Sequence, residues 1–440
     1  MTPDLARFTR LARDNPKMRF NSLMGLLFRA DGLRDSFERQ PSRKAPGVDG
    51  VKKADYAEDL EKRLAALSAD LRSLGYRPSP SRRTWIPKSN GGRRPLGIPS
   101  FEDRIVQGRL SQILQAIWEP EFWDCSYGFR PQRSAHDALR KVAKVITHGR
   151  VSWVVEADIK GFFDEVSHEH MMRFLAHRIA DPRMLRILRR FLKAGVMEDG
   201  RFHGSERGTP QGGLVSPVLA NIYLHYVLDW WFEGRFKKAC TGEAHLVRYA
   251  DDFIACFAHE SDARKFLAAL RARLAKFALE VEPTKTRMIR FGRFAQRDCH
   301  KDGRRRPETF TFLGLTHYVT RSRTGRFAVG RRTDAKRMRK KLREFGQRLR
   351  SIRVQGGRAM VEYARRHVLG HQQYYGVSGN SGPLRAYFRA ANGLLFKWLN
   401  RRSQRRSLSW KRFYELSSRG AFLPTPRIVH NLYPPPTRMS

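Results

Sequence analysis

Three aspartates are the residues through which this sequence first suggests chemistry. Asp251 and Asp252 follow each other in Tyr-Ala-Asp-Asp (249–252), between two apolar runs that predict a strand, a tight turn and a second strand. Asp158 ends another apolar, strand-like run, in which Glu156 is a lesser alternative ligand. Aspartates that converge from two strand segments can hold two Mg2+ ions about 3.5–4 Å apart, an arrangement that suits in-line phosphoryl transfer. Mg2+ prefers oxygen ligands, which explains carboxylates in place of His or Cys, and Mn2+ is the expected substitute.

An isolated Asp-Asp pair is more commonly a solvated turn than a functional site. The charge of the whole chain favours the functional interpretation here. The 440 residues hold 86 Lys and Arg against 42 Asp and Glu, a net charge of +44. An ordinary fold gains nothing from such self-repulsion, so we expect a polyanionic partner that is bound less tightly as salt rises. A content of 41% hydrophobic and 11% aromatic residues excludes a disordered basic tail and predicts a large core.

The cysteines and the apolar segments indicate the compartment in which the protein works. The four cysteines are scattered along the chain: Cys125, Cys240, Cys256 and Cys299. None lies in a Cys-x-x-Cys spacing, which predicts a reducing compartment, no disulfide framework and no zinc site. Residues 1–20 lack a signal-peptide core, and polar residues interrupt the apolar segment 218–232. We therefore expect a soluble, cytoplasmic protein with no membrane partner, and a buried helix at 218–232.

The hydrophobic pattern predicts an α+β protein in which strands and helices alternate after residue 150. Helices are expected at 1–40, 55–75, 102–120, 134–146, 167–180, 183–193, 216–232 and 261–279. Strands are expected as a hairpin at 83–99, a single strand at 151–158, a second hairpin at 245–257, and short strands near 280, near 290 and at 309–312. Ser22 and Ser261 are the expected N-caps of their helices, and residues 301–306 are expected to form a basic surface loop.

The composition shifts after residue 320 and indicates a separate, basic, all-α domain. Residues 321–440 hold 29 Lys and Arg against 4 Asp and Glu, and a helix is predicted at 333–353 with Thr333 as its cap and Asp334 as a first-turn acid. Its apolar seam is ordinary helix packing, so we expect its cationic faces to bind a ligand. Two further helices are expected at 357–371 and 382–400. The predicted divisions are a basic N-terminal extension (1–40), a core region (41–320), the helical domain (321–402) and a basic DNA-binding segment (403–440).

Four further residues suit contacts with a nucleotide, and each has an ordinary structural alternative. Phe163 could lie beneath an incoming sugar and exclude a 2′-hydroxyl, although a core aromatic is equally expected. Gln211, in the loop Gly-Thr-Pro-Gln-Gly-Gly (208–213), can hydrogen-bond a sugar or base, and a plain loop-to-helix junction is its alternative. Lys88 and Arg94 flank the turn of the first hairpin and suit a clamp on a triphosphate, although isolated cations on a hairpin are usually just solvated.

The order of these blocks resembles the bacterial group II intron-encoded reverse transcriptase/maturase family along nearly the whole chain. The blocks that resemble its fingers are Ala-Pro-Gly-Val-Asp-Gly (45–50), Ile-Pro-Lys (86–88), Arg-Pro-Leu-Gly-Ile-Pro (94–99) and Tyr-Gly-Phe-Arg-Pro (127–131). The blocks that resemble its palm are Ala-Asp-Ile-Lys-Gly-Phe-Phe-Asp (157–164), residues 208–213 and 249–252, Pro-Thr-Lys-Thr (283–286) and Phe-Leu-Gly (312–314). The blocks that resemble its thumb are Gly-His-Gln-Gln-Tyr-Tyr-Gly (370–376) and the run 398–406. Several motifs in one order are far more specific than any one of them.

The resemblance implies a right-hand polymerase fold, with fingers, a palm that contains an antiparallel sheet, and an all-α thumb. It implies that Asp158, Asp251 and Asp252 are catalytic and bind the two Mg2+ ions. The implied dNTP contacts are Lys88, Arg94, Ile159, Phe163 and Gln211. The implied nucleic-acid contacts are Arg304, Arg305, Arg306, Arg337, Lys340, Lys341, Arg401, Arg402, Arg405 and Arg406.

The activity that the resemblance implies is RNA-directed DNA polymerisation. Such a protein binds its parent group II intron RNA, assists its splicing and copies it by target-primed reverse transcription during retrohoming. Its partners would be that RNA, target DNA, a primer–template duplex and dNTPs, in a bacterial cytoplasm with association to the nucleoid. A broad basic surface suits structured RNA, which proteins recognise largely by shape and phosphate contacts.

One departure from the family concerns the Cys/His-rich nuclease domain of many members. Residues 403–440 contain no Cys and only His430, so we expect no metal nuclease there, and insertion would rely on single-stranded or replicating target DNA. Three alternatives stay open: a domesticated reverse transcriptase in DNA repair or phage defence, an RNA-binding splicing cofactor without polymerase activity, and an RNA-directed RNA polymerase. The three aspartates and Gln211 argue against the second of these, and Phe163 disfavours the third.

Overall fold

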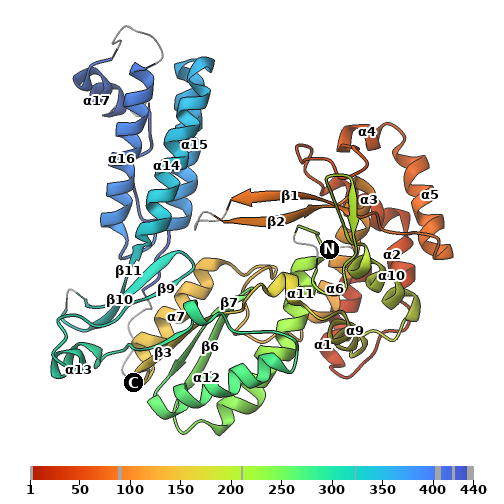
Figure 1. Cartoon of the computed structure of the whole chain (residues 1–440), viewed down its shortest axis with the longest axis horizontal. Helices are drawn as coiled ribbons and strands as arrows, with labels where there is room; N and C mark the ends of the chain where they lie inside the picture. Colours follow the sequence, from red (N-terminus) through yellow and green to blue (C-terminus); the bar gives the residue numbers. More distant parts are fainter. Residues whose placement is uncertain are drawn as a thin grey trace.

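The protein extends from a helical bundle at one end to a helical N-terminal region at the other, with a central sheet between them (Figure 1). The computed structural model describes residues 3–87, 92–209, 212–322, 324–401, 408–418 and 422–433. Five residues that were predicted to contact nucleotides or nucleic acid lie outside the described residues: Lys88, Gln211, Arg402, Arg405 and Arg406.

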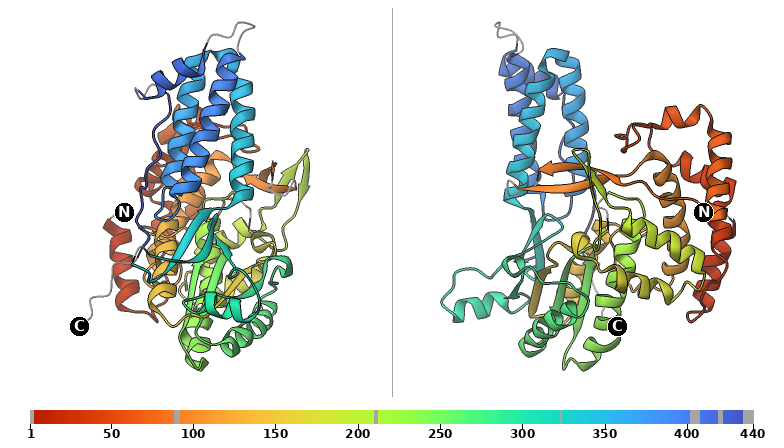
Figure 2. Two further views of the ribbon diagram at one scale, coloured as in Figure 1. Left: turned by 90° about the vertical axis from the view of Figure 1, so that its left-hand side faces the viewer. Right: turned by 45° about the vertical axis from the view of Figure 1, so that its right-hand side comes forward.

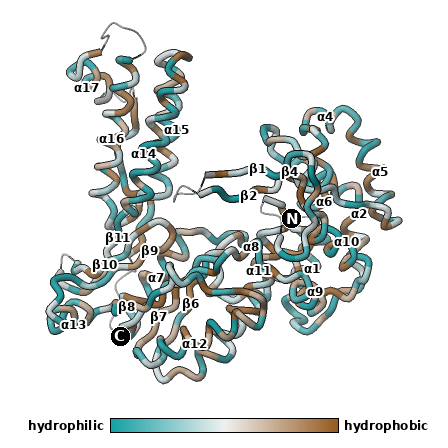
Figure 3. The backbone as a smooth tube through the Cα atoms, viewed as in Figure 1, coloured by the Kyte–Doolittle hydropathy of each residue, from teal (hydrophilic) through white to brown (hydrophobic). Residues whose placement is uncertain are grey.

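The central sheet has the strand order β6-β7-β3-β8, and each neighbouring pair is antiparallel. Its strands are β3 (Trp153–Asp158), β6 (Ala244–Tyr249), β7 (Asp252–Phe257) and β8 (Arg287–Arg290). Side chains alternate between the two faces, so Val154 and Ile254 pack with α7 (Ala135–His148), while Val155 packs with α12 (Glu260–Ala275). Helices therefore cover both faces, and hydrophobic segments run through the sheet in Figure 3.

The N-terminal region contains six helices, and a small mixed sheet adjoins it. The helices are α1 (Pro3–Asp14), α2 (Met24–Phe28), α3 (Ala30–Glu38), α4 (Lys53–Ala57), α5 (Leu60–Ser73) and α6 (Phe101–Trp118). The sheet has the order β2-β1-β4-β5 and consists of β1 (Ser81–Pro87), β2 (Arg93–Ile98), β4 (Val196–Glu198) and β5 (Arg201–His203). The β1–β2 hairpin leaves this region and projects toward the helical bundle (Figure 1).

Four shorter helices connect the N-terminal region to the central sheet. They are α8 (Phe162–Glu165), α9 (His168–Ala176), α10 (Pro182–Lys193) and α11 (Ser216–Leu224). The predicted helix 216–232 continues beyond α11 as π-helical turns at His225–Asp229 and Phe232–Phe236. One large hydrophobic core joins these helices to the N-terminal region and to one face of the sheet.

The helical bundle stands on a three-stranded antiparallel sheet of order β11-β10-β9. The strands are β9 (Phe310–Phe312), β10 (Leu315–Arg321) and β11 (Phe327–Thr333), and α13 (Ala295–Lys301) precedes them. The bundle helices are α14 (Ala335–Ile352), α15 (Gly357–Tyr375), α16 (Ser381–Asn400) and α17 (Trp410–Ser418). Phe345, Leu349 and Ile352 are buried against α15 and α16, which confirms the predicted seam of the first helix.

The last described segment, residues 427–433, returns to the junction between the bundle and the central sheet. His430 forms a parallel bridge with Val377 and stacks on His136 of α7, with 3.7 Å between the ring centroids. Leu432 is fully buried in the core that α7 shares with β10, β11 and the start of α16. The segment thus joins three parts of the chain that are far apart in sequence.

The three predicted helix caps differ from those in the structure. The backbone N–H groups of Leu23 and Met24 donate to Asp181, a carboxylate from a distant segment, so Ser22 is not the cap. The helix predicted at 261–279 begins at Glu260, with His259 rather than Ser261 at its N-cap. Asp334, the expected first-turn acid, is instead the N-cap of α14, where it accepts from the N–H of Arg337, one residue after the expected cap Thr333.

Three further predictions concern the start of the helical domain, the state of the cysteines and the absence of a membrane span. The predicted start of the helical domain at residue 321 is the end of β10, whereas the first bundle helix begins at Ala335. All four cysteines are free, in agreement with the prediction of no disulfide framework. Within the part of the chain that the structure describes, every helix is too short or too polar to cross a lipid bilayer.

Candidate active site

The three predicted aspartates meet at one end of the central sheet. Asp158 is the last residue of β3 and pairs in register with Asp252, the first residue of β7. The turn from β6 to β7 holds Ala250 in the left-handed region, with φ of 58°, and places Asp251 immediately before β7. The hairpin predicted from the sequence is therefore confirmed, and it sets two adjacent carboxylates beside a third from β3.

These carboxylates repel one another in a site that is largely removed from water. Burial, together with the charges of Asp158 and Asp251, raises the pKa of Asp252 to about 7. Burial and the charge of Asp158 also raise the pKa of Asp251. Like charges held this close disfavour ionisation, and a bound cation reverses that effect. The shifted pKa values therefore mark this end of the sheet as a site suited to a positively charged ligand.

Three cationic side chains from separate elements act on the aspartates. Lys285, in the turn Pro283–Lys285 before β8, forms an ion pair with Asp158, and the hydrogen bond to that carboxylate raises the pKa of Lys285. The charge of Arg94 on β2 opposes the rise in the pKa of Asp251, and Arg337 on α14 does the same for Asp252. Sequence reasoning named Arg94 and Arg337 but not Lys285, whose only signal was its place in Pro-Thr-Lys-Thr (283–286).

The donor atoms at this site fit Mg2+ in kind, since all three side chains offer carboxylate oxygens. Among the described residues, however, no three His, Cys, Asp or Glu side chains are gathered closely enough to hold a metal ion as they lie. The ammonium group of Lys285 rests on Asp158 and would have to give way to an ion there. Glu156, the lesser alternative ligand, is engaged elsewhere, because it accepts hydrogen bonds from Arg287 and from the N–H of Thr311.

A fully buried ion pair supports the turn that carries Asp251. The guanidinium of Arg248 on β6 donates to Asp229, with 2.7 Å from Nε to Oδ1, and both side chains are completely buried. Its remaining N–H groups reach the side chains of Asn221 and Ser126 and, at 3.0 Å, the carbonyl oxygen of Ala250. All five donors of this arginine are therefore satisfied, and one of them fixes the left-handed residue of the turn.

A loop that contains an exposed aromatic ring lies against the same turn. Backbone hydrogen bonds join Tyr127 N–H to the Arg248 carbonyl and Arg248 N–H to the Cys125 carbonyl. A Cβ atom on Gly128 would stand 2.4 Å from the nitrogen of Ala250, so only glycine permits this approach. Phe129 follows with φ of 60° and 48% of its surface exposed, and its ring lies 6.5 Å from that of Tyr249.

Holding a bulky exposed residue in the left-handed region costs free energy, and such strain often marks a functional position. Sequence reasoning quoted this block, Tyr-Gly-Phe-Arg-Pro (127–131), only as part of the family resemblance and did not single out Phe129. No local pattern in the sequence signals its strained backbone.

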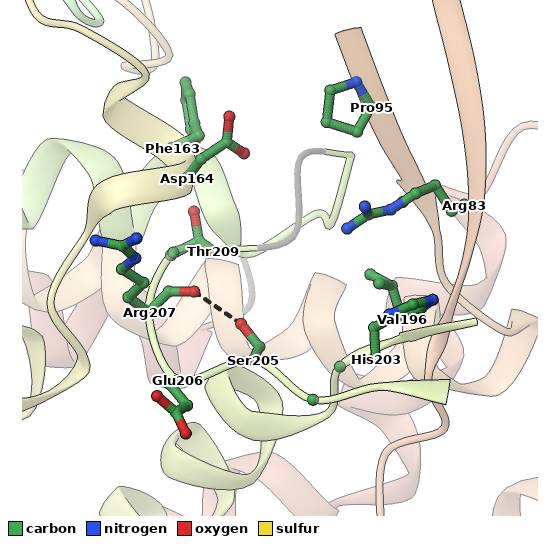
Figure 4. Close-up of a pocket in the computed structure, with 14 residues that line it drawn as sticks. Arg83, Pro95, Phe163, Asp164, Val196, His203, Ser205, Glu206, Arg207 and Thr209 are labelled. Atoms are coloured by element: carbon green, nitrogen blue, oxygen red, sulfur yellow. Dashed lines mark hydrogen bonds between the residues drawn. The ribbon is translucent and has the colours of Figure 1, made fainter. Parts of the chain in front are cut away.

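A cleft of about 680 Å3 opens where α8, the β1–β2 hairpin and the β4–β5 hairpin approach one another (Figure 4). Phe163, Asp164 and Thr209 line one side, and Arg83 and Pro95 lie across from them. Phe163 is half-buried. Its ring packs on Phe162 of the core, with 5.2 Å between the ring centroids, and part of its surface stays exposed. Its backbone carbonyl accepts from the N–H of Thr209, which fixes the loop that leads to residue 210.

The other residues that were predicted to contact a nucleotide or nucleic acid differ in their burial and in their ion pairs. Ile159 is buried in the large core, so only its backbone could meet a nucleotide. Lys341 is half-buried, lies 5.7 Å from the Tyr375 ring, and burial lowers its pKa, which places it inside the bundle. Arg305, Arg306 and Arg401 are exposed, whereas Arg304 pairs with Asp302 and Lys340 with Glu344. Their roles as nucleic-acid contacts stay predictions.

Comparisons with known proteins agree with this geometry. Residues 86–317, more than half of the chain, match the family described as reverse transcriptase (RNA-dependent DNA polymerase). Protein YkfC of Escherichia coli (strain K12) is 39% identical over 237 residues, which cover 52% of this chain and 62% of that protein. The group II intron-encoded protein LtrA of Lactococcus lactis subsp. cremoris is 38% identical over 222 residues, which cover 50% of this chain and 37% of that protein.

A third relative, the nuclear intron maturase 2, mitochondrial, of Arabidopsis thaliana, is 27% identical over 177 residues, covering 31% of this chain and 24% of that protein. The chain thus matches less than two thirds of the length of these relatives. The matched region contains β3, β6 and β7 and therefore all three aspartates. The chain belongs to the reverse transcriptase (RNA-dependent DNA polymerase) family, and the predicted resemblance to its group II intron-encoded members is confirmed.

Proposed function

We propose that this protein is an RNA-directed DNA polymerase that binds a group II intron RNA, assists its splicing and copies it by target-primed reverse transcription. The observation that carries the proposal is the meeting of Asp158, Asp251 and Asp252 at one end of an antiparallel sheet, in a chain of the reverse transcriptase family. Converging carboxylates that can hold two metal ions are what two-metal phosphoryl transfer requires of a protein.

The proposed fold is a right hand in which the central sheet is the palm, the N-terminal region the fingers and the helical bundle the thumb. Arg94 on the β1–β2 hairpin and Arg337 on α14 support this assignment. The charge of Arg94 opposes the rise in the pKa of Asp251 and the charge of Arg337 opposes the rise in the pKa of Asp252, so both elements lie close to the aspartates. The hairpin and the bundle stand above the same end of the sheet (Figure 2). A primer–template duplex would lie between them, with its phosphates facing the cationic surface of α14.

The chain's own residues would divide the work of nucleotide addition. Bound Mg2+ would supply the Lewis acid that activates the primer 3′-hydroxyl and stabilises the departing pyrophosphate. Asp251 and Asp252 must be deprotonated to serve as ligands, and Arg94 would balance the charge of the triphosphate. Phe163 would exclude a 2′-hydroxyl from the cleft, and Gln211 and Lys88 would complete the dNTP site.

Phe129 and Tyr249 would form an aromatic platform for the primer strand. Their rings lie beside the turn that carries Asp251, and the exposed face of Phe129 offers a stacking surface for a base or sugar. The buried Arg248–Asp229 pair holds this platform and the catalytic turn in one rigid unit. The primer end would therefore be positioned by the same substructure that presents the aspartates.

The net charge of the chain and the names of two relatives support the splicing role. Group II intron-encoded protein and intron maturase are the names of two relatives, and a net charge of +44 suits a large structured RNA. Exposed arginines on α14 and at Arg305, Arg306 and Arg401 are the proposed RNA contacts, and target DNA would bind near the bundle. A bacterial cytoplasm is the proposed site of action.

Substitution of one aspartate tests the polymerase activity directly. Asp251→Ala should abolish extension of a DNA primer on an RNA template while leaving RNA binding within about twofold. Glu156→Gln is the matched control, because that carboxylate is engaged by Arg287 and should not be needed for chemistry. Extension by Asp251→Ala at the wild-type rate would reject the catalytic assignment, and loss of RNA binding together with extension would show that the aspartate is structural.

The RNA that accompanies the protein tests the splicing role. The protein would be purified from its native cell at moderate salt, and the nuclease-protected RNA would be sequenced. One dominant, structured RNA that flanks this reading frame supports an intron ribonucleoprotein. A diffuse mixture of cellular RNAs would reject it and leave a free-standing reverse transcriptase, with DNA repair or phage defence as its role.

A further inference from the structure

A groove between α9 and α10 lies on the side of the molecule away from the helical bundle (Figure 1). It encloses about 670 Å3, a volume typical of sites that hold a small molecule or one residue of a polymer. Its apolar lining comes from Met172 and Ala176 of α9 and Leu185 of α10, which are only half-buried. The polymerase site described above uses none of these residues.

Four exposed cations stand around this apolar floor. Arg186, Arg189 and Lys193 follow one another along one side of α10, and Arg173 faces them from α9. Glu169 is the one acidic residue of the lining. Within the described part of the chain none of the four cations forms an ion pair, whereas Arg178, between the two helices, is buried and paired with Glu121.

Unpaired cations on a helix are usually a solvated face, but the apolar floor argues against that explanation here. Side chains such as Met172 and Leu185 gain nothing from facing water at the bottom of a groove, and a ligand with an apolar face would cover them. Residues three and four apart on a helix stand about 5–6 Å from one another, close to the separation of successive phosphates on a nucleic-acid strand. The combination fits a ligand with an apolar face and charges at regular intervals.

We propose that the α9–α10 groove binds a single-stranded stretch of RNA, with one unpaired base on the apolar floor and the flanking phosphates on Arg186, Arg189 and Lys193. Unpaired bases are recognised by stacking on aromatic rings or on guanidinium planes, and Arg173 and Arg186 offer such planes at the edge of the apolar floor, whereas duplex RNA keeps its bases enclosed. An acidic peptide matches the charge but lacks the flat faces that the floor would cover. The choice of RNA as the source of the strand rests on the proposed function, while strand binding itself needs no polymerase activity.

The test compares two double variants that each remove two positive charges from the full-length protein. Arg186→Gln/Arg189→Gln changes the groove, and Arg271→Gln/Lys276→Gln changes exposed cations on α12 and near its end, which also form no ion pair in the described residues. The probe is fluorescein-labelled rU12, added to protein already saturated with an unlabelled primer–template duplex so that the polymerase site is filled. Anisotropy is measured as the salt concentration is raised.

The groove variant should bind rU12 on the order of tenfold less tightly at 0.1 M salt, with the salt slope reduced by about 1.4 for two lost phosphate contacts. The control variant should change the affinity by less than threefold. Equal losses in both variants would overturn the proposal, since they would report only the net charge. A groove variant that still binds rU12 normally, but that has lost the affinity of the wild type for an acidic peptide, would assign the groove to a protein partner and also overturn the proposal.

Two further measurements test the position of the base and keep the groove separate from the polymerase site. An rU12 probe with one 4-thiouridine should crosslink to residues 172–189, and crosslinks confined to other segments would reject the site. The same probe as dT12 should bind less tightly, and equal or tighter binding of dT12 would overturn the choice of RNA as the strand. Primer extension on a preannealed template should stay within twofold of wild type in the groove variant, so failure of the polymerase assignment would leave the binding result unaffected.

Discussion

The buried arginine behind the turn that carries Asp251 offers the sharpest test of how the site is held. Arg248→Met would keep the length and the apolar stem of the side chain but remove all five N–H donors. Asp229 would then stay fully buried without a counter-charge, which costs about 3–5 kcal/mol of folding stability. The lost bonds to Asn221, Ser126 and Ala250 add about 1 kcal/mol each at most, so we expect a loss of about 5 kcal/mol or more.

A second substitution separates the charge from the packing. Asp229→Leu in the Arg248→Met background removes the orphaned carboxylate, and replacing a buried pair by apolar residues is commonly neutral or stabilising. The double variant should therefore recover most of the lost stability. It should still extend primers slowly, because the Ala250 carbonyl has lost the donor that fixes the turn.

Urea unfolding measures the stability of the whole protein, and hydrogen exchange measures the opening of individual backbone amides. The amides of Tyr127 and Arg248, which join the loop to β6, should exchange faster in the single variant and near the wild-type rate in the double variant. Arg264→Met is the control, because its pair with Glu260 is exposed and worth less than about 1 kcal/mol. The reasoning is refuted if the single variant is as stable as wild type or the double variant is no better than the single.

Three other substitutions give separate outcomes. Phe163→Ala should admit ribonucleotides, measured as the ratio of rNTP to dNTP incorporation, and unchanged sugar selectivity would remove its proposed role. Phe129→Asn, which tolerates the left-handed backbone, should raise the Kd for primer–template several-fold and leave the KM for dNTP unchanged; an unaffected Kd would reject the platform. Burial raises the pKa of Asp103 from 3.8 to about 6, so the folded protein keeps a proton that the unfolded chain releases between those values. Stability should fall by about 2 kcal/mol as pH rises from 4 to 6, and Asp103→Asn should flatten that fall in urea titrations.

The elements that position the aspartates could be predicted because their local signals agree with the fold. The β6–β7 hairpin consists of two apolar runs around a turn that favours Asp, and β3 is an apolar run that ends at Asp158. The β10–β11 hairpin escaped prediction for the opposite reason. It buries His317 and Arg331 side by side in the core, so charged residues stand where a pattern of hydrophobicity expects apolar ones.

The parts of the site that come from distant segments left no local trace in the sequence. Asp181 caps α2 across a long separation in the chain, and nothing near residue 22 signals that partner. Lys285 meets Asp158 only because the turn before β8 folds back beside β3. The strained backbone of Phe129 depends on the approach of Gly128 to Ala250, which is likewise a tertiary contact.

The returning segment 427–433 completes the joint between the bundle and the central sheet late in the life of the chain. Its His430 and Leu432 belong to a core that also contains residues of α7, β10 and α16, elements that are synthesised before it. The bundle also contacts α7 without this segment, because the His136 ring hydrogen-bonds the carbonyl oxygen of Tyr374 on α15. We therefore expect the bundle of a nascent chain to be held less firmly beside the aspartates until the segment arrives, so its cationic helices can meet RNA before that joint is complete.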